Sequence, residues 1–438
     1  MGENDDSKKR HAFFGSAGMA AAGMMSRVRL RKAESASESE VEESGDPTSD
    51  LPLESEPEGT DQTDHSPAEY TGWKAAVVGE TGAGGFGAGM DVVFQKLDGV
   101  RLFGLADLNS EKSEDSRVHA GALRGYDTLA NLLEEESPGL VSIASASTRD
   151  RKEQIRAVLE SGAHVFLEAP LARTLKEGDE IVAMEQASQG SIAVRYPMRL
   201  DPALQQFHSE MDSLIGELKE IRAWGSCDES SGGEDLLLTG IPLFDLIRWF
   251  AGEASYCTAR ISEDGVAAIA EDAHESERND LGLLLGDSIQ AEFEMESGVR
   301  VSFSSSRDLQ PVLGPAGLLF VGSKSKMRLF AGSQPVLSYL QNPVPDSPEK
   351  QENWTSWPTS NSKPLSEIES SESLEAANRL IARNWIDGAQ EGVEPVASAH
   401  NALKALEMAH GIWQAGVTMK RAYFPLVNRL HPLSEESQ

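Results

Sequence analysis

The residues best suited to chemistry are glycines that follow a short apolar run. Lys74–Gly79 reads KAAVVG, and further glycines stand at positions 82, 84, 85, 87 and 89. Glycines let the backbone approach a pyrophosphate, whose charge the first amides of a following helix can bind. The apolar residues that predict this helix recur at helical spacing, at Met90, Val93, Phe94 and Leu97. Because the spacing is not a strict GxGxxG, a glycine-rich turn without a ligand is the alternative.

A carboxylate that could hold a ribose stands at the end of the next apolar run. Val100–Ala106 is followed by Asp107, 28 residues after Gly79. An acid at the end of the second strand can accept hydrogen bonds from the ribose hydroxyls. The next basic residues, Lys112 and Arg117, do not stand beside it as a 2′-phosphate would require. The predicted cofactor is therefore NAD, with NADP less favoured.

Alternating strands and helices are needed to bring these residues to one edge. Strand-like apolar runs are Lys74–Gly79, Val100–Ala106, Leu140–Ser145, His164–Leu167 and Ser191–Val194. Helical patterns lie at Leu129–Glu136, through Ile155–Leu159 and up to Gln186. Strands that alternate with helices at this spacing predict a parallel sheet with right-handed crossovers. We therefore expect an α/β protein with a Rossmann domain over residues 73–195.

From residue 73 to about residue 425 the chain resembles the Gfo/Idh/MocA family of glucose–fructose oxidoreductases and inositol dehydrogenases. The family's Glu-Lys-Pro motif stands here as Glu168-Ala169-Pro170, after Gly162–Phe166. Further matching segments are Gly79–Gly87, Met198-Arg199 with Pro202, Ile215–Ile221, Gly232–Gly240 and Leu243–Trp249. The resemblance implies a Rossmann domain and then, over residues 196–438, an α/β domain with an open, mainly antiparallel sheet. It also implies homo-oligomers that form through this sheet.

The residue pattern beyond the first domain supports such a second domain. Strand-like segments separated by turns are Glu220–Trp224, Tyr256–Ile261, Ser288–Met295, Arg300–Ser305, Gly317–Val321 and Lys326–Phe330. Residues 341–372 are rich in Pro and Ser and predict a long surface excursion, with Trp354 and Trp357 as anchors. Helices are predicted over Ser373–Gly388 and Ala397–Val417.

The resemblance identifies three proton-transfer positions, and none of them carries a titratable group here. Hydride transfer between a carbinol carbon and nicotinamide requires a group that takes or gives the hydroxyl proton. In the family this is the Lys of Glu-Lys-Pro, helped by an Asp and a His on the second domain. The corresponding residues are Ala169, Leu238 and Pro242. Because general acid–base help contributes ~10²–10⁴-fold, a dehydrogenase without it would be very slow.

Candidate site residues follow from position and from the resemblance. The predicted catalytic residues are Tyr196, Asp235 and Asp245, with Tyr196 or Asp235 as proton donor, and the predicted substrate-binding residues are Arg195 and Arg199. The predicted cofactor contacts are Gly79, Thr81, Gly82, Gly84, Phe86, Gly87, Asp107, Ser145 and Glu168. For the acids and arginines the alternative is a structural role, as helix-terminal charges or ion pairs. No cluster has metal-ligand spacing, so no metal site is predicted.

Two functions from different classes are open. The first is an NAD(H)-dependent oxidoreductase that acts on a hydroxylated small molecule, a sugar, cyclitol or derivative, through an altered proton relay. The second is a catalytically inactive relative that serves as a nucleotide or ligand sensor or as an oligomeric scaffold. The missing Lys, Asp and His favour the second, whereas the retained glycine turn and Asp107 favour the first.

The charge of the chain is uneven and limits its partners. The net charge is −32, and residues 34–73 carry acids but no Lys or Arg. Nucleic-acid binding is therefore not expected, and residues 34–72 predict a disordered acidic linker. Residues 1–33 predict a basic tail in a cytoplasmic protein, or alternatively a degenerate twin-arginine-like export signal. No apolar stretch is long enough to span a membrane, and two cysteines, Cys227 and Cys257, exclude a disulfide scaffold.

Overall fold

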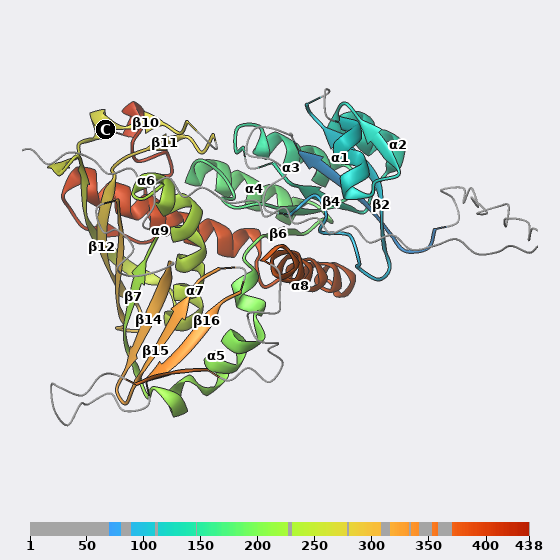
Figure 1. Cartoon of the computed structure of the whole chain (residues 1–438). Helices are drawn as coiled ribbons and strands as arrows, with labels where there is room; N and C mark the ends of the chain where they lie inside the picture. Colours follow the sequence, from blue (N-terminus) through green and yellow to red (C-terminus); the bar gives the residue numbers. More distant parts are fainter. Residues whose placement is uncertain are drawn as a thin grey trace, which may run out of the picture. The chain divides into compact units, whose positions relative to one another are not determined.

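The described part of the chain contains two large β-sheets and one two-stranded sheet (Figure 1). The structure is a computed structural model and describes residues 70–79, 89–109, 113–145, 147–226, 230–277, 280–307, 316–332, 334–340, 353–357 and 370–437. All of these belong to one compact unit, residues 65–438. The predicted basic tail or export signal and nearly all of the predicted acidic linker lie outside the described residues.

The first sheet is parallel and has the strand order β3-β2-β1-β4-β5-β6. Its strands are β1 (Trp73–Gly79), β2 (Val100–Asp107), β3 (Arg124–Tyr126), β4 (Leu140–Ile143), β5 (His164–Leu167) and β6 (Ile192–Val194). The chain reverses direction across the sheet between β1 and β4, which is where doubly wound sheets bind ligands at the carboxyl ends of their strands. The predicted Rossmann domain is thereby confirmed.

Helices cover this parallel sheet, and one of them comes from the far end of the chain. The local helices are α1 (Ser113–Ala120), α2 (Leu129–Glu136), α3 (Arg151–Glu160) and α4 (Leu175–Ala187). Helix α8 (Ser370–Glu391) packs against β5 and β6. Its Trp385 stacks on Phe166 of β5 and donates a hydrogen bond to the carbonyl oxygen of Ser191 at 3.3 Å. The chain therefore returns to the Rossmann sheet after building the second one.

The prediction of a helix after the glycine-rich turn is wrong for residues 89–99, the part of this segment that the structure describes. Residues 89–99 form consecutive turns, in which the amide of Gln95 bonds to the carbonyl of Val92 at 3.0 Å. Gly89, Lys96 and Gly99 have left-handed backbone angles, which a right-handed helix cannot include. The residues between Gly89 and Lys96 are too few to offset the free-energy cost of helix nucleation. The apolar residues of the expected helix face are nevertheless buried: Met90, Val93, Phe94 and Leu97. Their burial needs only a compact turn.

The second sheet has ten strands in the described residues and is open and mainly antiparallel, as predicted. Its order is β17-β16-β15-β14-β7-β13-β12-β8-β18, with β9 on β8, and β13–β7 is the parallel pair. The strands are β7 (Leu218–Trp224), β8 (Ala254–Glu263), β9 (Val266–Ala267), β12 (Ser288–Met295), β13 (Arg300–Ser306), β14 (Gly317–Gly322), β15 (Lys326–Phe330), β16 (Val336–Leu340), β17 (Trp354–Ser356) and β18 (Ala422–Tyr423). Trp354 of the predicted surface excursion thus lies in an edge strand.

Helices pack on one face of this sheet, while the other face is polar. Helix α9 (Ala399–Thr418) contacts β8 and α7 (Ile241–Ala251), and it also reaches α4 and β6 of the Rossmann domain. Along β12 and β13, Phe293 and Phe303 are buried, whereas Glu292 is exposed and Ser302 half-buried. Helix α5 (Pro202–Leu214) follows the last strand of the Rossmann sheet along the chain. Every helix that the structure describes is too short or too polar for a bilayer crossing.

Candidate active site

The predicted cofactor residues Gly79, Asp107, Ser145 and Glu168 lie at the carboxyl edge of the parallel sheet. Gly79 pairs with Asp107 in the β1–β2 register. The amide of Ala144 bonds to the carbonyl of Val78 at 2.8 Å, which places Ser145 just beyond the end of β1. Glu168 follows β5, the next strand after β4. The remaining predicted contacts, Thr81, Gly82, Gly84, Phe86 and Gly87, lie outside the described residues.

Asp107 is buried and already holds its own loop. Its Oδ2 accepts a hydrogen bond from Ser116 Oγ at 2.7 Å, and its Oδ1 accepts one from the amide of Asn109 at 2.9 Å. These bonds tie the end of β2 to helix α1.

Glu168 and Arg195 form an ion pair at the ends of β5 and β6. Nε of Arg195 lies 2.5 Å from Oε2 of Glu168, and Nη2 lies 2.8 Å from Oε1. The amide of Arg195 bonds to the carbonyl of Leu167 at 2.9 Å, which fixes its backbone against β5. A residue predicted to contact the cofactor and one predicted to bind substrate are thus bonded to each other. Ala169 follows Glu168 and is joined to Pro170 by a cis peptide.

Arg151 links the ends of β4 and β5 and was not among the predicted site residues. Its buried guanidinium donates to the carbonyl oxygens of Ser145 at 2.7 Å and Glu168 at 2.8 Å, and also to that of Pro170. Burial lowers the pKa of Arg151 to about 10, a decrease that Glu168 opposes, so the side chain stays charged at neutral pH. In the sequence, a single arginine at the start of a helix does not indicate a site residue. Only the tertiary structure brings the carbonyl groups of Ser145, Glu168 and Pro170 to its guanidinium.

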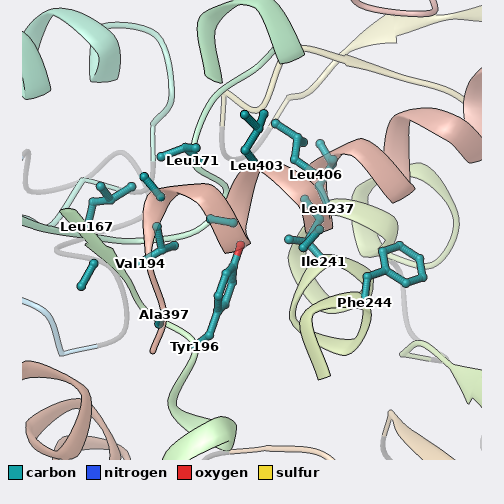
Figure 2. Packing of buried hydrophobic residues seen from close by; sticks show 14 of the residues in the cluster. Leu167, Leu171, Val194, Tyr196, Leu237, Ile241, Phe244, Ala397, Leu403 and Leu406 are labelled. Carbon is teal, nitrogen blue, oxygen red and sulfur yellow. The ribbon is translucent and has the colours of Figure 1, made fainter. Parts of the chain in front are cut away.

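Tyr196 lies in the hydrophobic core between the two domains. Its ring is almost completely buried, and its hydroxyl has no hydrogen-bond partner in the described residues. Burial, together with the nearby carboxylates of Asp245 and Glu168, raises the pKa of the phenol well above its usual value. Figure 2 shows the apolar side chains that pack around it, among them Leu167, Leu171, Val194, Leu237, Ile241, Ala397, Leu403 and Leu406.

The two predicted catalytic acids are buried in polar contacts of the second domain. Asp235 accepts from Ser305 Oγ at 2.6 Å and from the amide of Ser226 at 3.1 Å. Asp245 accepts from Nε of Arg199 at 2.7 Å, and Nη2 of Arg199 also donates to the Asp245 carbonyl at 2.9 Å. Burial raises the pKa of both carboxyl groups more than these bonds lower it. Both acids support local structure, and their catalytic roles stay predictions.

The three positions that correspond to the family's proton-transfer groups differ in how far they are exposed to solvent. Ala169 and Pro242 are half-buried, and Leu238 is 38% exposed. Leu238 lies in a short π-helix, Leu236–Gly240, that leads into α7. None of Ala169, Leu238 and Pro242 can take up a proton through its side chain. In the described residues, no group of three or more His, Cys, Asp or Glu side chains could hold a metal ion.

A hairpin of the second domain touches the loops that follow β4 and β5. Asp280 lies between β10 (His274–Glu275) and β11 (Leu283–Leu284). Its Oδ2 accepts from Ser147 Oγ at 2.8 Å, its carbonyl accepts from Thr148 Oγ1 at 2.7 Å, and Arg149 and Arg173 contact its carboxylate. The second domain is thereby bonded directly to the loops around the candidate site.

Comparisons with known proteins agree with this architecture. Residues 74–196 match the family model of the Gfo/Idh/MocA oxidoreductases, described as an oxidoreductase family with an NAD-binding Rossmann fold. The 4-carboxy-2-hydroxymuconate-6-semialdehyde dehydrogenase of Sphingobium is 26% identical over 137 residues, which are 31% of this chain and 42% of that protein. An uncharacterized oxidoreductase of Bacillus subtilis is 28% identical over 125 residues, 27% of this chain and 32% of its own length. The matches thus span about a third to two fifths of these relatives.

Solved structures resemble the described fold over nearly their full length. An oxidoreductase from Agrobacterium radiobacter in complex with NAD+, L-tartaric acid and magnesium has a TM-score of 0.63 at 16% identity, covering 81% of this chain and 98% of its own. A myo-inositol 2-dehydrogenase from Lactobacillus plantarum has a TM-score of 0.59 at 18% identity, with 80% and 99% covered. At such identities the likeness establishes the fold.

Proposed function

The Rossmann domain of this chain belongs to the NAD-binding Gfo/Idh/MocA oxidoreductase family, and from that premise we propose that the protein is an NAD(H)-dependent oxidoreductase. Its substrate is a small molecule with a hydroxyl group, such as a sugar, cyclitol or derivative. One observation carries the proposal: Gly79, Asp107, Ser145 and Glu168 meet at the carboxyl edge of the parallel sheet, beside its switch point. A scaffold alone has no physical need for the glycine-rich turn or for Asp107.

In this proposal the chain's residues bind and orient, and the proton follows a different route from that of the family. Asp107 accepts hydrogen bonds from the adenosine ribose, and Arg151 fixes the loops after β4 and β5 through their carbonyls. NAD supplies the hydride acceptor when it is bound. Tyr196 is the proposed proton donor, because its hydroxyl is unpartnered in the described residues, whereas Asp235 already accepts from Ser305 and Ser226.

The first test is calorimetric titration of the full chain with NADH and, separately, with NADPH. Micromolar NADH binding with at least tenfold weaker NADPH binding is expected, because Asp107 repels a 2′-phosphate. The control variant D107N keeps the shape of the side chain and should reduce the difference between the two nucleotides. A folded sample that binds neither nucleotide would contradict the proposal.

A catalytically inactive sensor or scaffold is the second candidate, and a specific observation favours it. Ala169, Leu238 and Pro242 present no titratable side chain where the family transfers protons, and the described segment 89–99 lacks the helix whose first amides would bind a pyrophosphate. Nucleotide binding without turnover of any sugar, cyclitol or sugar acid would favour this candidate over the first.

We also propose that the second domain begins at Tyr196 and assembles homo-oligomers through the open face of its sheet. That face carries a hollow of about 460 Å³, lined by polar residues that include Thr258, Arg260, Gln290, Glu292, Ser302 and Ser304. In the strand register Glu292 lies opposite both Thr258 and Ser302. A face of mixed charge can pair with its own copy around a twofold axis.

A further inference from the structure

Arg195 has one nitrogen left for a ligand. Its Nε and Nη2 are bonded to Glu168, whereas Nη1 makes no hydrogen bond to any residue that the structure describes. The side chain is 21% exposed, so this nitrogen is not sealed in the core. An arginine whose remaining N–H groups reach solvent can bind a carboxylate with a charge-assisted hydrogen bond.

Arg195 lies close to Ala169, the residue that stands where the family's Glu-Lys-Pro motif has its lysine. The Glu168 carboxylate that holds the guanidinium also accepts from the amide of Ala169, at 3.2 Å. Ala169 ends at its β-carbon, so it supplies neither charge nor bulk at this point. A permanent cation therefore stands next to the position where the family carries a titratable one.

The charges around this pair favour an anion. Arg195 and Arg151 both lie against Glu168, one through its carboxylate and one through its backbone carbonyl. Two guanidinium groups and one carboxylate leave a net positive charge, in a chain that carries 71 acidic and 39 basic residues. The neighbouring contact repeats the pattern, because Arg149 and Arg173 share the single carboxylate of Asp280. Phosphate-like or carboxylate groups are attracted here although the whole chain repels them.

The other arginine predicted to bind substrate is not available for this role. Arg199 is 10% exposed and holds the buried carboxylate of Asp245 through Nε, while its Nη2 donates to the carbonyl of the same residue. Releasing it would leave a buried charge without a partner, which is costly.

We propose that the substrate carries a carboxylate, which Nη1 of Arg195 binds beside Ala169. The substrate class is thereby narrowed from hydroxylated small molecules to hydroxy acids and sugar acids. This inference rests on the proposed function, because it assumes that the edge beside Glu168 is the substrate site.

The test compares acids with their neutral counterparts on the full chain saturated with NADH. The probe pairs are D-glucuronate against D-glucose and L-tartrate against L-threitol, each titrated by calorimetry. At least one acid should bind tenfold or more tightly than its neutral counterpart. The R195Q variant should lose this preference while the neutral compound binds as before. R222Q is the matched control, because Arg222 forms a similar pair with Glu220 on the second sheet.

Further measurements keep the test decisive if R195Q does not fold. R195K keeps a charge, so it should retain part of the preference. For the unaltered protein, raising NaCl from 50 to 500 mM should weaken acid binding severalfold and leave the neutral compounds unchanged. If neither acid binds more tightly than its neutral counterpart, the inference is wrong. The same conclusion holds if neither acid binds at all. If NADH fails to bind, the proposed function fails separately, and the same acid criterion is applied to the nucleotide-free protein.

Discussion

Arg173 and Asp280 stand 107 residues apart in the chain and are joined by two hydrogen bonds. Nη2 of Arg173 donates to Oδ1 of Asp280 at 2.5 Å and to its carbonyl oxygen at 2.8 Å. Arg173 belongs to the loop after the Glu168-Ala169-Pro170 turn, and Asp280 belongs to a hairpin of the second domain. This bond couples the two domains beside the candidate site.

D280N should destabilise the protein by about 1–2 kcal/mol at pH 7.5, because charge-assisted bonds become neutral ones. Partial burial opposes ionisation of Asp280, but Ser147 and Arg173 outweigh it and hold its pKa below the usual value. The stabilisation is therefore present above pH ~4 and is lost as the pH falls through the lowered pKa. Urea unfolding of both proteins at several pH values checks this. E217Q, at the exposed ion pair between Glu217 and Lys219, is the control and should change stability little.

Y196F separates a catalytic role of Tyr196 from a structural one. Removing a buried hydroxyl that has no partner should leave stability unchanged or increase it by about 1 kcal/mol. If the phenol donates the proton, turnover should fall ~10²-fold or more, with NADH affinity unchanged. Full turnover in Y196F on an identified substrate would show that Tyr196 is a core residue only. D235N is the companion variant: its amide keeps one acceptor oxygen but places an NH2 group against the donor of Ser305 or Ser226, so it should reduce stability as well as turnover.

His431 should make stability depend on pH below neutrality. Burial, with Arg173 nearby, lowers its pKa to about 4, and its ring packs against that of His410 at 4.9 Å. Between pH ~6.5 and 4 the unfolded chain binds a proton that the folded chain does not, so stability falls by up to about 3 kcal/mol as the pH decreases.

Chemical unfolding at pH 7.5 and 5.0 measures this slope. H431Q cannot be protonated but keeps an acceptor near the amide of Leu433, which bonds to Nδ1 of His431 at 3.3 Å. The variant should therefore show a shallower slope than the unaltered protein. Equal slopes would contradict the assignment, since groups other than His431 would then account for the dependence.

E292R tests assembly through the open sheet face. Glu292 is exposed and stands between Thr258 and Ser302 in a register row that continues to Arg222. A charge reversal there should convert an oligomer into monomers, detected by light scattering after gel filtration. E271R lies on a 3₁₀ helix away from this row and should leave assembly intact. An unaltered protein that is already monomeric would refute the proposed interface.

The helices and strands could be predicted from the local sequence, because buried apolar residues repeat with the period of a helix or of a strand. Most strands from Trp73–Gly79 to Lys326–Phe330 were readable from apolar runs and alternation, and the two long C-terminal helices from their apolar spacing. The short strands Arg124–Tyr126, Val266–Ala267, His274–Glu275 and Leu283–Leu284 were not predicted. The order of Gly79, Asp107 and Glu168 at strand ends followed from the same reading. The apolar residues of the segment 89–99 were also correctly expected to be buried, although a turn rather than a helix buries them.

The hydrogen-bond and ion-pair partners of the polar side chains were decided by the tertiary structure alone. Asp235 meets Ser305 across 70 residues, and Arg199 meets Asp245 across 46. A carboxylate that is free for catalysis and one committed to a buried bond have the same residue type and the same local spacing. Only the packing of distant segments sets which one it is. The sequence by itself therefore predicted the two large sheets and the strand ends at which the candidate site residues stand, while the fold decided which charged groups are bonded to each other.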